Sequence, residues 1–174
     1  MRGGGGSTYG IVTSVTYSTY PSVPVQFYTF QANITNSSAL LELVGGLLRY
    51  QTQFTDDGWG GYGFMTDQQL FFSYMAPNMT NETAAATTEA WHNYTQSLEP
   101  FGVVSAEQTY WVPAWYELYE SLTSGGAQNG GNLMLTSRLL SRDTVANKYA
   151  EVAEVLVNCY AGFKYVLHAS SYLD

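Results

Sequence analysis

Two aromatic-rich runs with a two-residue break between them limit the folds open to this chain. Residues 59–66 and 69–75 consist mainly of aromatic, glycine and other apolar residues, and Asp67-Gln68 stands between them. Runs of this length joined by two polar residues are typical of a β-hairpin. The pattern therefore predicts an antiparallel sheet.

Further strands and helices are expected along the chain. Strand-like runs of β-branched and aromatic residues occur at 10–20, 25–32, 103–112 and 133–140. Capping residues or proline predict helix starts near 36–38, 80–81, 113 and 143, the last opening a long helix with an apolar stripe that reaches Val166. A glycine-rich loop is expected at 125–132. Together these elements predict an α+β fold, an antiparallel β-sheet with helices packed on one face.

The other face of this sheet needs a ligand or a partner. Residues 25–30 alternate so that aromatic and small polar side chains fall on both sides of the expected strand. A sheet face that is semi-apolar and not covered by helices is typical of a binding surface.

A glycine pair interrupts the first expected helix. Gly45 and Gly46 lie among the helically spaced residues Leu40, Leu43 and Leu47. Each glycine costs about 1 kcal/mol relative to alanine in a helix. The pair therefore predicts that a neighbouring group packs closely there.

Charge excludes two classes of function. The chain has 174 residues, 6 Lys+Arg and 14 Asp+Glu, for a net charge of −8, and no basic residue occurs between Arg49 and Arg138. Binding to nucleic acid or to an anionic membrane requires basic side chains. Both are therefore excluded as main functions, while a hydrophobic fraction of 45% is enough for a folded core.

Aromatic residues are abundant, with four Trp, fifteen Tyr and eight Phe. Tyrosine has an apolar body and a polar tip, which suits half-buried clefts and interfaces. It also favours β-structure. The composition alone leaves β-rich packing and a binding cleft equally open.

Five glycosylation sequons predict a secreted, glycosylated protein. Their asparagines are Asn33, Asn36, Asn78, Asn81 and Asn93. The alternative is plain richness in Ser and Thr. The single cysteine, Cys159, excludes a disulfide framework and a multi-cysteine zinc site, and on its helical stripe it is expected to be a buried thiol. Because Arg2 and a glycine run follow Met1 without a signal peptide, we expect a mature form, an expression product or a fragment.

The glycine run at the start admits two interpretations. It is either a flexible linker, or a loop in which a ligand approaches the backbone closely. The stretch Arg2-Gly-Gly-Gly-Gly-Ser-Thr-Tyr-Gly-Ile-Val-Thr13 runs directly into an expected strand. It resembles the last segment of the flavin domain in FAD-linked oxidases, most closely the berberine bridge enzyme-like branch of the vanillyl-alcohol oxidase/PCMH superfamily. Ser137-Arg-Leu-Leu-Ser-Arg142 after a glycine-rich loop agrees with this, and the resemblance extends over nearly the whole chain.

The resemblance implies a division of the chain. Residues 1–22 would be the terminal segment of the FAD-binding (PCMH-type) domain, and 23–174 a substrate-binding α+β domain that is truncated at its C-terminus. The open sheet face would roof the flavin and the substrate cleft. The positions carried over as FAD-binding are Gly4, Gly5, Gly6, Ser7, Tyr9, Gly10 and Ile11. The family's pyrophosphate loop with its flavin-linked histidine, its cysteine attachment segment and its C-terminal Tyr-x-Asn-Tyr region have no match here, which predicts a fragment.

Several side chains are candidates for the substrate pocket. They lie on expected strands and are Tyr62, Tyr74, Gln108, Tyr110, Trp111 and Arg138, of which strand alternation allows only about half to face a cleft. Arg138 would hold substrate or, alternatively, pair with a carboxylate such as Glu107. No catalytic residue is assigned and no metal site is expected, because neither His92 nor His168 has a ligand companion at useful spacing. Glu117 and Glu120 on one helix make an unconvincing glycosidase pair.

Three functions follow from these patterns. The first is part of a secreted FAD-dependent oxidoreductase that oxidises a sugar, alcohol, phenolic or alkaloid by hydride transfer to flavin, usually with O2 as acceptor. The isolated chain would be inactive, and the missing flavin domain would be its partner, joined covalently or as a separate chain. The alternative is a non-catalytic, aromatic-rich secreted module that binds carbohydrate or another apolar ligand. The third is a structural piece that pairs with a separate chain.

Overall fold

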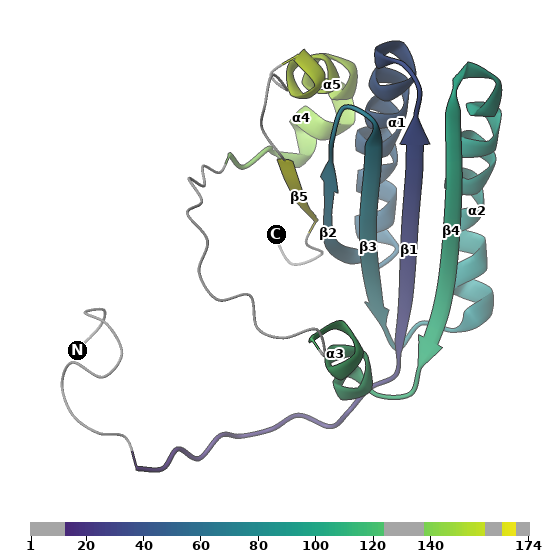
Figure 1. Ribbon diagram of the computed structural model, residues 1–174. Coiled ribbons are helices and arrows are strands. Elements are labelled where there is room, and N and C mark those ends of the chain that lie inside the picture. The colour runs from purple at the N-terminus through teal and green to yellow at the C-terminus, as the bar shows by residue number, and fades with distance from the viewer. Residues whose placement is uncertain (1–12, 124–137, 159–164, 170–174) are drawn as a thin grey trace.

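The computed structural model describes residues 13–123 and 138–158, and the backbone of 165–169. Within these ranges five strands form one antiparallel sheet in the order β4-β1-β3-β2-β5 (Figure 1). The strands are β1 (Val25–Ile34), β2 (Gly60–Met65), β3 (Gln69–Pro77), β4 (Val103–Val112) and β5 (Tyr165–Ala169). The predicted hairpin is β2 and β3, which confirms the antiparallel assignment.

Helices precede or follow most strands. They are α1 (Ser37–Asp56), α2 (Asn81–Ser97), the 3-10 helix η1 (Glu99–Phe101), α3 (Trp115–Thr123), α4 (Arg142–Asn147) and α5 (Tyr149–Asn158). The first two begin at the predicted capping residues. The Asn36 Oδ1 atom accepts a hydrogen bond from the Ala39 amide at 2.9 Å, and the Thr80 hydroxyl accepts one from the Thr83 amide at 3.2 Å. Each cap satisfies an amide that the first helical turn leaves without a partner. None of the described helices is long and apolar enough to cross a membrane.

The main core lies between the sheet and the helices α1 and α2. Phe72 is 1% exposed and stands among five other rings, with centroid distances of 4.5 Å to Tyr74 and 5.1 Å to Phe30. Helices α4 and α5 pack beside α1 on the same side of the sheet. Arg142 fixes α4 to the end of α1 by two hydrogen bonds to the Asp56 carboxylate, at 2.8 and 2.7 Å. The predicted fold class is therefore confirmed.

Helix α3 is the exception to this layering. It lies at one end of the opposite sheet face, where Leu118 packs on Val25 and Phe27 in a second, smaller core. The helix begins two residues after Pro113, close to the predicted start. Its position shortens the sheet face left uncovered.

The predicted close packing at the glycine pair is confirmed. A Cβ atom built on Gly46 would lie 2.1 Å from Tyr94 Cε1, whereas one on Gly45 would meet only Ala153 Cβ at 3.8 Å. Tyr94 also donates a hydrogen bond to the Glu42 carbonyl at 2.7 Å. The Tyr94 side chain of α2 thus lies across the backbone of α1 at Gly46.

Three expected elements differ from the structure. Residues 13–20, expected in a strand, are exposed and carry no regular structure, because no neighbouring strand pairs with them in the described chain. Residues 138–140 are likewise not a strand, and 133–137 lie outside the described residues. The long final helix is two helices divided at Lys148, and its first cap is Ser141 rather than Asp143. Val166, expected on that helix, lies in β5. Cys159 and residues 125–132 lie outside the described residues.

Candidate functional site

One face of the sheet faces away from α1 and α2, and we call it the open face. Strand pairing assigns residues to it, because cross-strand partners share a face and neighbours along a strand alternate. On β1 and β3 its members are Val25, Phe27, Thr29, Gln31 and Asn33, and Gln69, Phe71, Ser73, Met75 and Pro77. On β2 and β4 they are Gly60, Tyr62 and Phe64, and Val104, Ala106, Gln108, Tyr110 and Val112. No member of this set on β1 to β4 is acidic, basic or histidine, and the register of β5 adds His168 opposite Tyr62.

A polar row crosses the middle of the open face. Tyr62 pairs with Ser73, Ser73 with Thr29, and Thr29 with Gln108, so hydroxyl and amide side chains stand side by side on four strands. Tyr62 is 47% exposed. On β4, the Tyr110 hydroxyl donates a hydrogen bond to Gln108 Oε1. The row can therefore offer several neutral donors and acceptors to a ligand.

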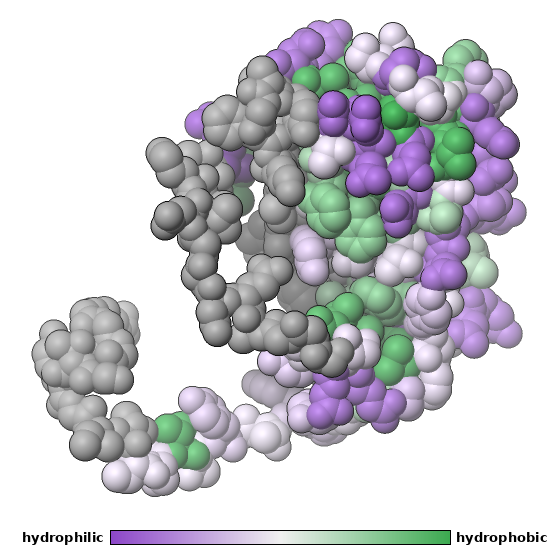
Figure 2. Space-filling view, in the orientation of Figure 1, coloured by the Kyte–Doolittle hydropathy of each residue, from purple (hydrophilic) through white to green (hydrophobic). Residues whose placement is uncertain are grey.

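Apolar groups border the polar row on both sides. On one side the ring centroids of Phe64 and Phe71 lie 5.1 Å apart, and the two ring planes are inclined at 32°. On the other side Phe27 and Met75 lie under Leu118 of α3. Figure 2 shows this face of the molecule, with hydrophilic residues gathered at its upper end and paler or apolar surface over the middle. The open face is thus semi-apolar, as predicted.

Exposed aromatic residues continue this surface onto α3. After Tyr110 of β4, the large exposed apolar side chains of α3 are Trp115, Tyr116, Tyr119 and Leu122. The ring centroids of Tyr116 and Tyr119 lie 6.3 Å apart. The Glu120 carboxylate, hydrogen-bonded to Tyr116, raises the pKa of that tyrosine. A concentration of exposed aromatic side chains is typical of an interaction surface.

The structure brings three of the predicted substrate-pocket residues together. Tyr62, Gln108 and Tyr110 lie on the open face, Gln108 in the same cross-strand row as Tyr62 and Tyr110 next to it. Trp111 is 52% exposed, but its pairing with Gln26 assigns it to the helix-covered face.

Tyr74 and Arg138 are placed elsewhere. Tyr74 is 2% exposed on the covered face and donates a hydrogen bond to Gln51 Oε1 at 2.5 Å, so it does not line the open face. Burial raises its pKa. Arg138 is exposed on a segment without regular structure, not on the expected strand. The predicted FAD-binding residues, Gly4 to Ile11, lie outside the described residues.

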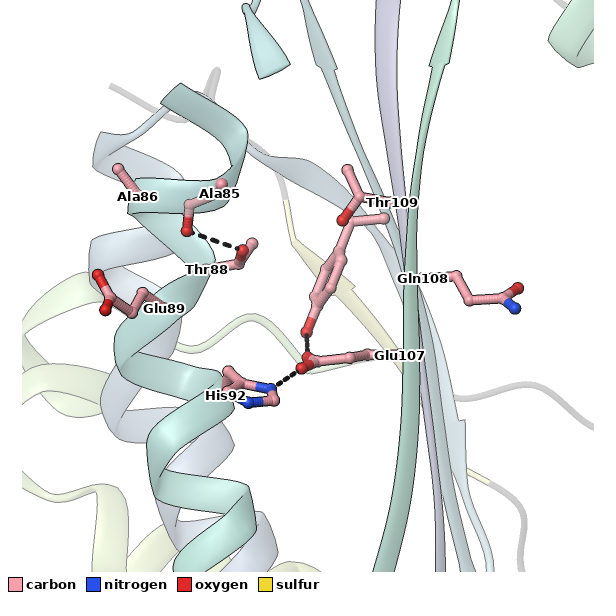
Figure 3. Close-up of a pocket in the computed structure, with 9 residues that line it drawn as sticks. Ala85, Ala86, Thr88, Glu89, His92, Glu107, Gln108 and Thr109 are labelled. Carbon is pink, nitrogen blue, oxygen red and sulfur yellow. Dashed lines mark hydrogen bonds and ion pairs between the residues drawn. The ribbon is translucent and has the colours of Figure 1, made fainter. Parts of the chain in front are cut away.

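A hollow lies on the other side of β4, between β4 and α2, and has a volume of about 520 Å³ (Figure 3). In it the Tyr28 hydroxyl donates a hydrogen bond to Glu107 Oε2, and Glu107 Oε1 contacts His92 Nδ1. Burial and the Glu107 carboxylate both raise the pKa of Tyr28. Figure 3 shows Gln108 pointing away from α2, to the opposite side of β4.

This network is absent from the sequence-based candidates. Glu107 was expected only as a partner of Arg138, and His92 was considered only as a metal ligand. The His92 side chain is exposed and contacts Glu107. The one available signal is that Glu107 is the only charged residue in β4. Its contacts tie the edge strand to α2. The described residues contain no group of three or more His, Cys, Asp or Glu that could hold a metal ion.

Known proteins show what this arrangement is similar to. No family model matches the chain. An uncharacterized FAD-linked oxidoreductase of Arthroderma benhamiae is 26% identical over 169 residues, which cover 90% of this chain and 28% of that protein. The FAD-linked oxidoreductase ffsJ of Aspergillus flavipes is 37% identical over 67 residues, or 36% of this chain and 10% of that protein.

Two solved structures share the fold. The VAO-type flavoprotein MtVAO713 from Myceliophthora thermophila C1 matches 78% of this chain and 27% of its own length, with a TM-score of 0.67 and 16% identity. The VAO-type flavoprotein MtVAO615 from the same organism matches 81% of this chain and 26% of its own length, with a TM-score of 0.64 and 15% identity. The two sequence relatives are named FAD-linked oxidoreductases, and the solved structures show that the chain shares a fold with part of two VAO-type flavoproteins. The chain spans about a quarter of the length of these proteins.

These relatives imply FAD, and the open face can be tested against that cofactor. Its aromatic and neutral polar side chains suit contact with a flat ring system such as isoalloxazine. On β1 to β4 it has no Lys or Arg that could bind phosphate groups. The described residues therefore fit the ring end of FAD, and the pyrophosphate would need residues outside them.

Proposed function

We propose that this chain is the substrate-binding part of a berberine bridge enzyme-like FAD-dependent oxidoreductase. The open face would roof the flavin ring and one side of the substrate cleft. The observation that carries this proposal is a sheet that is covered by helices on one face and left semi-apolar on the other, with no Asp, Glu, Lys or Arg on that face of β1 to β4. The chain spans about a quarter of its first FAD-linked relative.

The open face would position a small organic substrate against the flavin. The hydroxyls of Tyr62 and Thr29 and the amide of Gln108 would orient it, and the Phe64–Phe71 pair would exclude water. When bound, FAD supplies the redox chemistry, in which a substrate carbon loses a hydride to flavin and a proton passes to a base, with O2 as the usual acceptor. The substrate would be a sugar, alcohol, phenolic or alkaloid.

Two further properties belong to this proposal. The isolated chain would be inactive, because it needs the flavin-binding domain, covalently joined or separate, as its partner. The protein would be secreted and glycosylated, and in support of this all five sequon asparagines, Asn33, Asn36, Asn78, Asn81 and Asn93, are exposed.

The experiment compares two lysine substitutions in a longer protein that joins this chain to its upstream flavin-binding domain. Phe64→Lys places a cation on the open face, and Ala90→Lys places one on the exposed side of α2. We expect Phe64→Lys to reduce flavin content and flavin reduction by substrate, because a buried, unpaired charge weakens docking. Ala90→Lys should retain both.

Far-ultraviolet circular dichroism of each variant checks that the fold is intact. A longer protein that purifies without flavin would refute the proposal. Equal flavin content and reduction rates in the two variants would refute the assignment of the open face.

The second candidate function is an aromatic-rich binding module without catalysis. The exposed side chains of Trp115, Tyr116 and Tyr119 on α3 favour it, since aromatic rings can stack on carbohydrate. It predicts that the chain alone binds an oligosaccharide such as cellohexaose, and that Trp115→Ala abolishes binding. Absence of binding in isothermal titration calorimetry would eliminate this candidate.

A further inference from the structure

We propose that Asn93 carries an N-linked glycan in the secreted protein, whereas Asn36, which lies in the same sequence motif, serves the fold and stays unmodified. This rests on the proposed secretion of the protein, and it separates two sequons that the sequence alone does not distinguish. The glycan would mark the outer side of α2 as facing solvent when the chain is joined to its flavin-binding domain.

N-glycosylation consumes one hydrogen atom of the asparagine side chain. The Nδ2 atom displaces the pyrophosphate group of a lipid-linked oligosaccharide. A bond from Nδ2 to the first sugar carbon forms, the bond from that carbon to the phosphate oxygen breaks, and one amide proton is released, with no oxidation or reduction. An asparagine that keeps a glycan in a folded protein therefore needs a spare Nδ2 hydrogen and open space beside that atom.

Both Nδ2 hydrogens of Asn36 are in use. The atom donates to the Phe101 carbonyl at 3.0 Å and to Thr35 Oγ1 at 3.4 Å. Its partner atom Oδ1 accepts the Ala39 amide at 2.9 Å, as the cap of α1. Since a side-chain amide has only two such hydrogens, a sugar on Nδ2 would break a contact that ties the start of α1 to the segment before β4.

The space beside Asn36 Nδ2 is also taken. A Cβ atom built on Gly102 would lie 2.9 Å from Asn36 Nδ2 and 2.1 Å from Thr35 Oγ1, so the backbone at Gly102 passes against this amide. Gly102 has a φ of 99°, which glycine adopts readily, and its carbonyl accepts bonds from the Thr35 amide at 3.0 Å and hydroxyl at 3.2 Å. A sugar on Nδ2 would push these two segments apart.

Asn93 has the opposite surroundings. It is exposed and follows the fully buried Trp91 by two positions on α2, about 200° round the helix. Within the described residues no hydrogen bond holds its side chain. The residues three and four positions away, which are its neighbours on the helix surface, are all exposed as well, namely Glu89, Ala90, Gln96 and Ser97. A sugar on Asn93 would therefore extend into solvent without displacing a contact.

Folding makes the selection, because transfer of the sugar precedes it. Thr95, which completes the Asn93 motif, is 1% exposed in the folded chain and its hydroxyl donates to the His92 carbonyl at 3.0 Å. The motif is therefore accessible only before α2 packs on the sheet. A chain modified at Asn93 then folds unhindered, whereas a chain modified at Asn36 loses the contacts at this end of the sheet. Secreted, folded molecules should thus be unmodified at Asn36.

The test carries the longer flavin-containing protein through the secretory pathway of a yeast host by means of a signal peptide. Occupancy of each asparagine is measured by mass spectrometry of chymotryptic peptides, since no Lys or Arg lies between Arg49 and Arg138 for trypsin to cut. Electron-transfer fragmentation locates the sugar on one asparagine. We expect occupancy at Asn93 to exceed that at Asn36 by at least about tenfold.

Two outcomes overturn the proposal: similar occupancy of Asn36 and Asn93 in folded protein, and an Asn93 that stays unmodified. If the protein holds flavin but carries no glycan at any site, the proposed glycosylation fails together with this inference, and the flavin-linked function stands. A glycosylated protein without flavin overturns that function alone, because the contrast between the two asparagines is still measured.

Two substitutions at exposed positions then remove one motif each. Asn93→Gln removes the acceptor itself, and Ser38→Ala destroys the other motif without touching Asn36. We expect Asn93→Gln to lose one glycan, seen as faster migration in electrophoresis that enzymatic deglycosylation of both proteins abolishes, whereas Ser38→Ala migrates like the unsubstituted protein. A glycan lost from Ser38→Ala, or none lost from Asn93→Gln, contradicts the inference.

Discussion

The adjacent glycines of α1 should respond to the same substitution with opposite signs. Gly45→Ala adds a Cβ atom whose nearest neighbour is Ala153 Cβ at 3.8 Å, an ordinary contact distance. Alanine is better than glycine in a helix by about 0.8–1.0 kcal/mol. We therefore expect Gly45→Ala to raise the free energy of unfolding by about 1 kcal/mol.

Gly46→Ala gains the same helix-propensity free energy, but its new Cβ atom collides with the Tyr94 ring. The new Cβ atom would lie 2.1 Å from Cε1, 2.4 Å from Cζ and 2.5 Å from the hydroxyl oxygen. The ring must move, which disturbs its packing on Tyr50 and Trp91 at centroid distances of 5.6 and 5.8 Å. Overpacking of this kind costs about 1–3 kcal/mol.

The displacement also breaks a hydrogen bond. Tyr94 donates to the Glu42 carbonyl at 2.7 Å, and its loss costs about 0.5–1.5 kcal/mol. After subtraction of the helical gain, Gly46→Ala should lower the free energy of unfolding by about 1–3 kcal/mol. The two alanine variants should therefore differ by about 2–4 kcal/mol.

Urea unfolding followed by circular dichroism measures this difference. Gly46→Ala in a Tyr94→Ala background provides the control, since removal of the ring should make the substitution stabilising, like Gly45→Ala. If Gly46→Ala stabilises the protein while Tyr94 is present, the packing of α2 on α1 at this glycine is refuted.

Two further predictions concern the aromatic core. Burial raises the pKa values of three tyrosines, Tyr28, Tyr74 and Tyr94, that of Tyr94 to about 12. Their neutral forms therefore stabilise the folded state fully at pH values below the usual tyrosine pKa of 10.0. This stabilisation is lost as the pH rises through the pKa values of the folded state. Stability should fall progressively above pH 10, and ultraviolet titration at 295 nm should show three tyrosines that ionise late; ionisation of all tyrosines near pH 10 in the folded protein would contradict this. Phe72→Ala should lower the free energy of unfolding by about 3–5 kcal/mol, whereas Phe101→Ala, at a site 66% exposed, should change it by less than about 0.5 kcal/mol. Urea unfolding of the two variants measures the contrast, and similar values would contradict the assigned core.

Local sequence patterns predicted much of the fold. The break at Asp67-Gln68 and the caps Asn36 and Thr80 act within a few residues, so they could be recognised without knowledge of the tertiary structure. Strand 25–32 was likewise predicted, two residues short at its end. The region 13–20 alternates in the same way, but alternation only permits a strand. A strand also needs a partner, and partners are set by long-range pairing.

The site was predictable only in part, because strand register decides which face a residue occupies. Tyr62 and Tyr74 both lie on strands of one hairpin, yet the pairing places Tyr62 on the open face and Tyr74 in the core. Their local sequences do not distinguish the two outcomes. The Tyr28–Glu107–His92 network was missed for the same reason, since its members come from two strands and a helix far apart in the chain.

The most direct measurement of the central claim is site-specific thiol labelling at the open face. Tyr62→Cys and Ala90→Cys are each labelled with a maleimide, and the rate at that peptide is followed by mass spectrometry. The chain alone is compared with the longer protein that contains the flavin-binding domain. We expect labelling at position 62 to slow at least about tenfold in the longer protein, because the flavin-binding domain covers the open face, while the rate at position 90 stays the same. Equal rates at position 62, or protection at position 90 instead, would contradict the account.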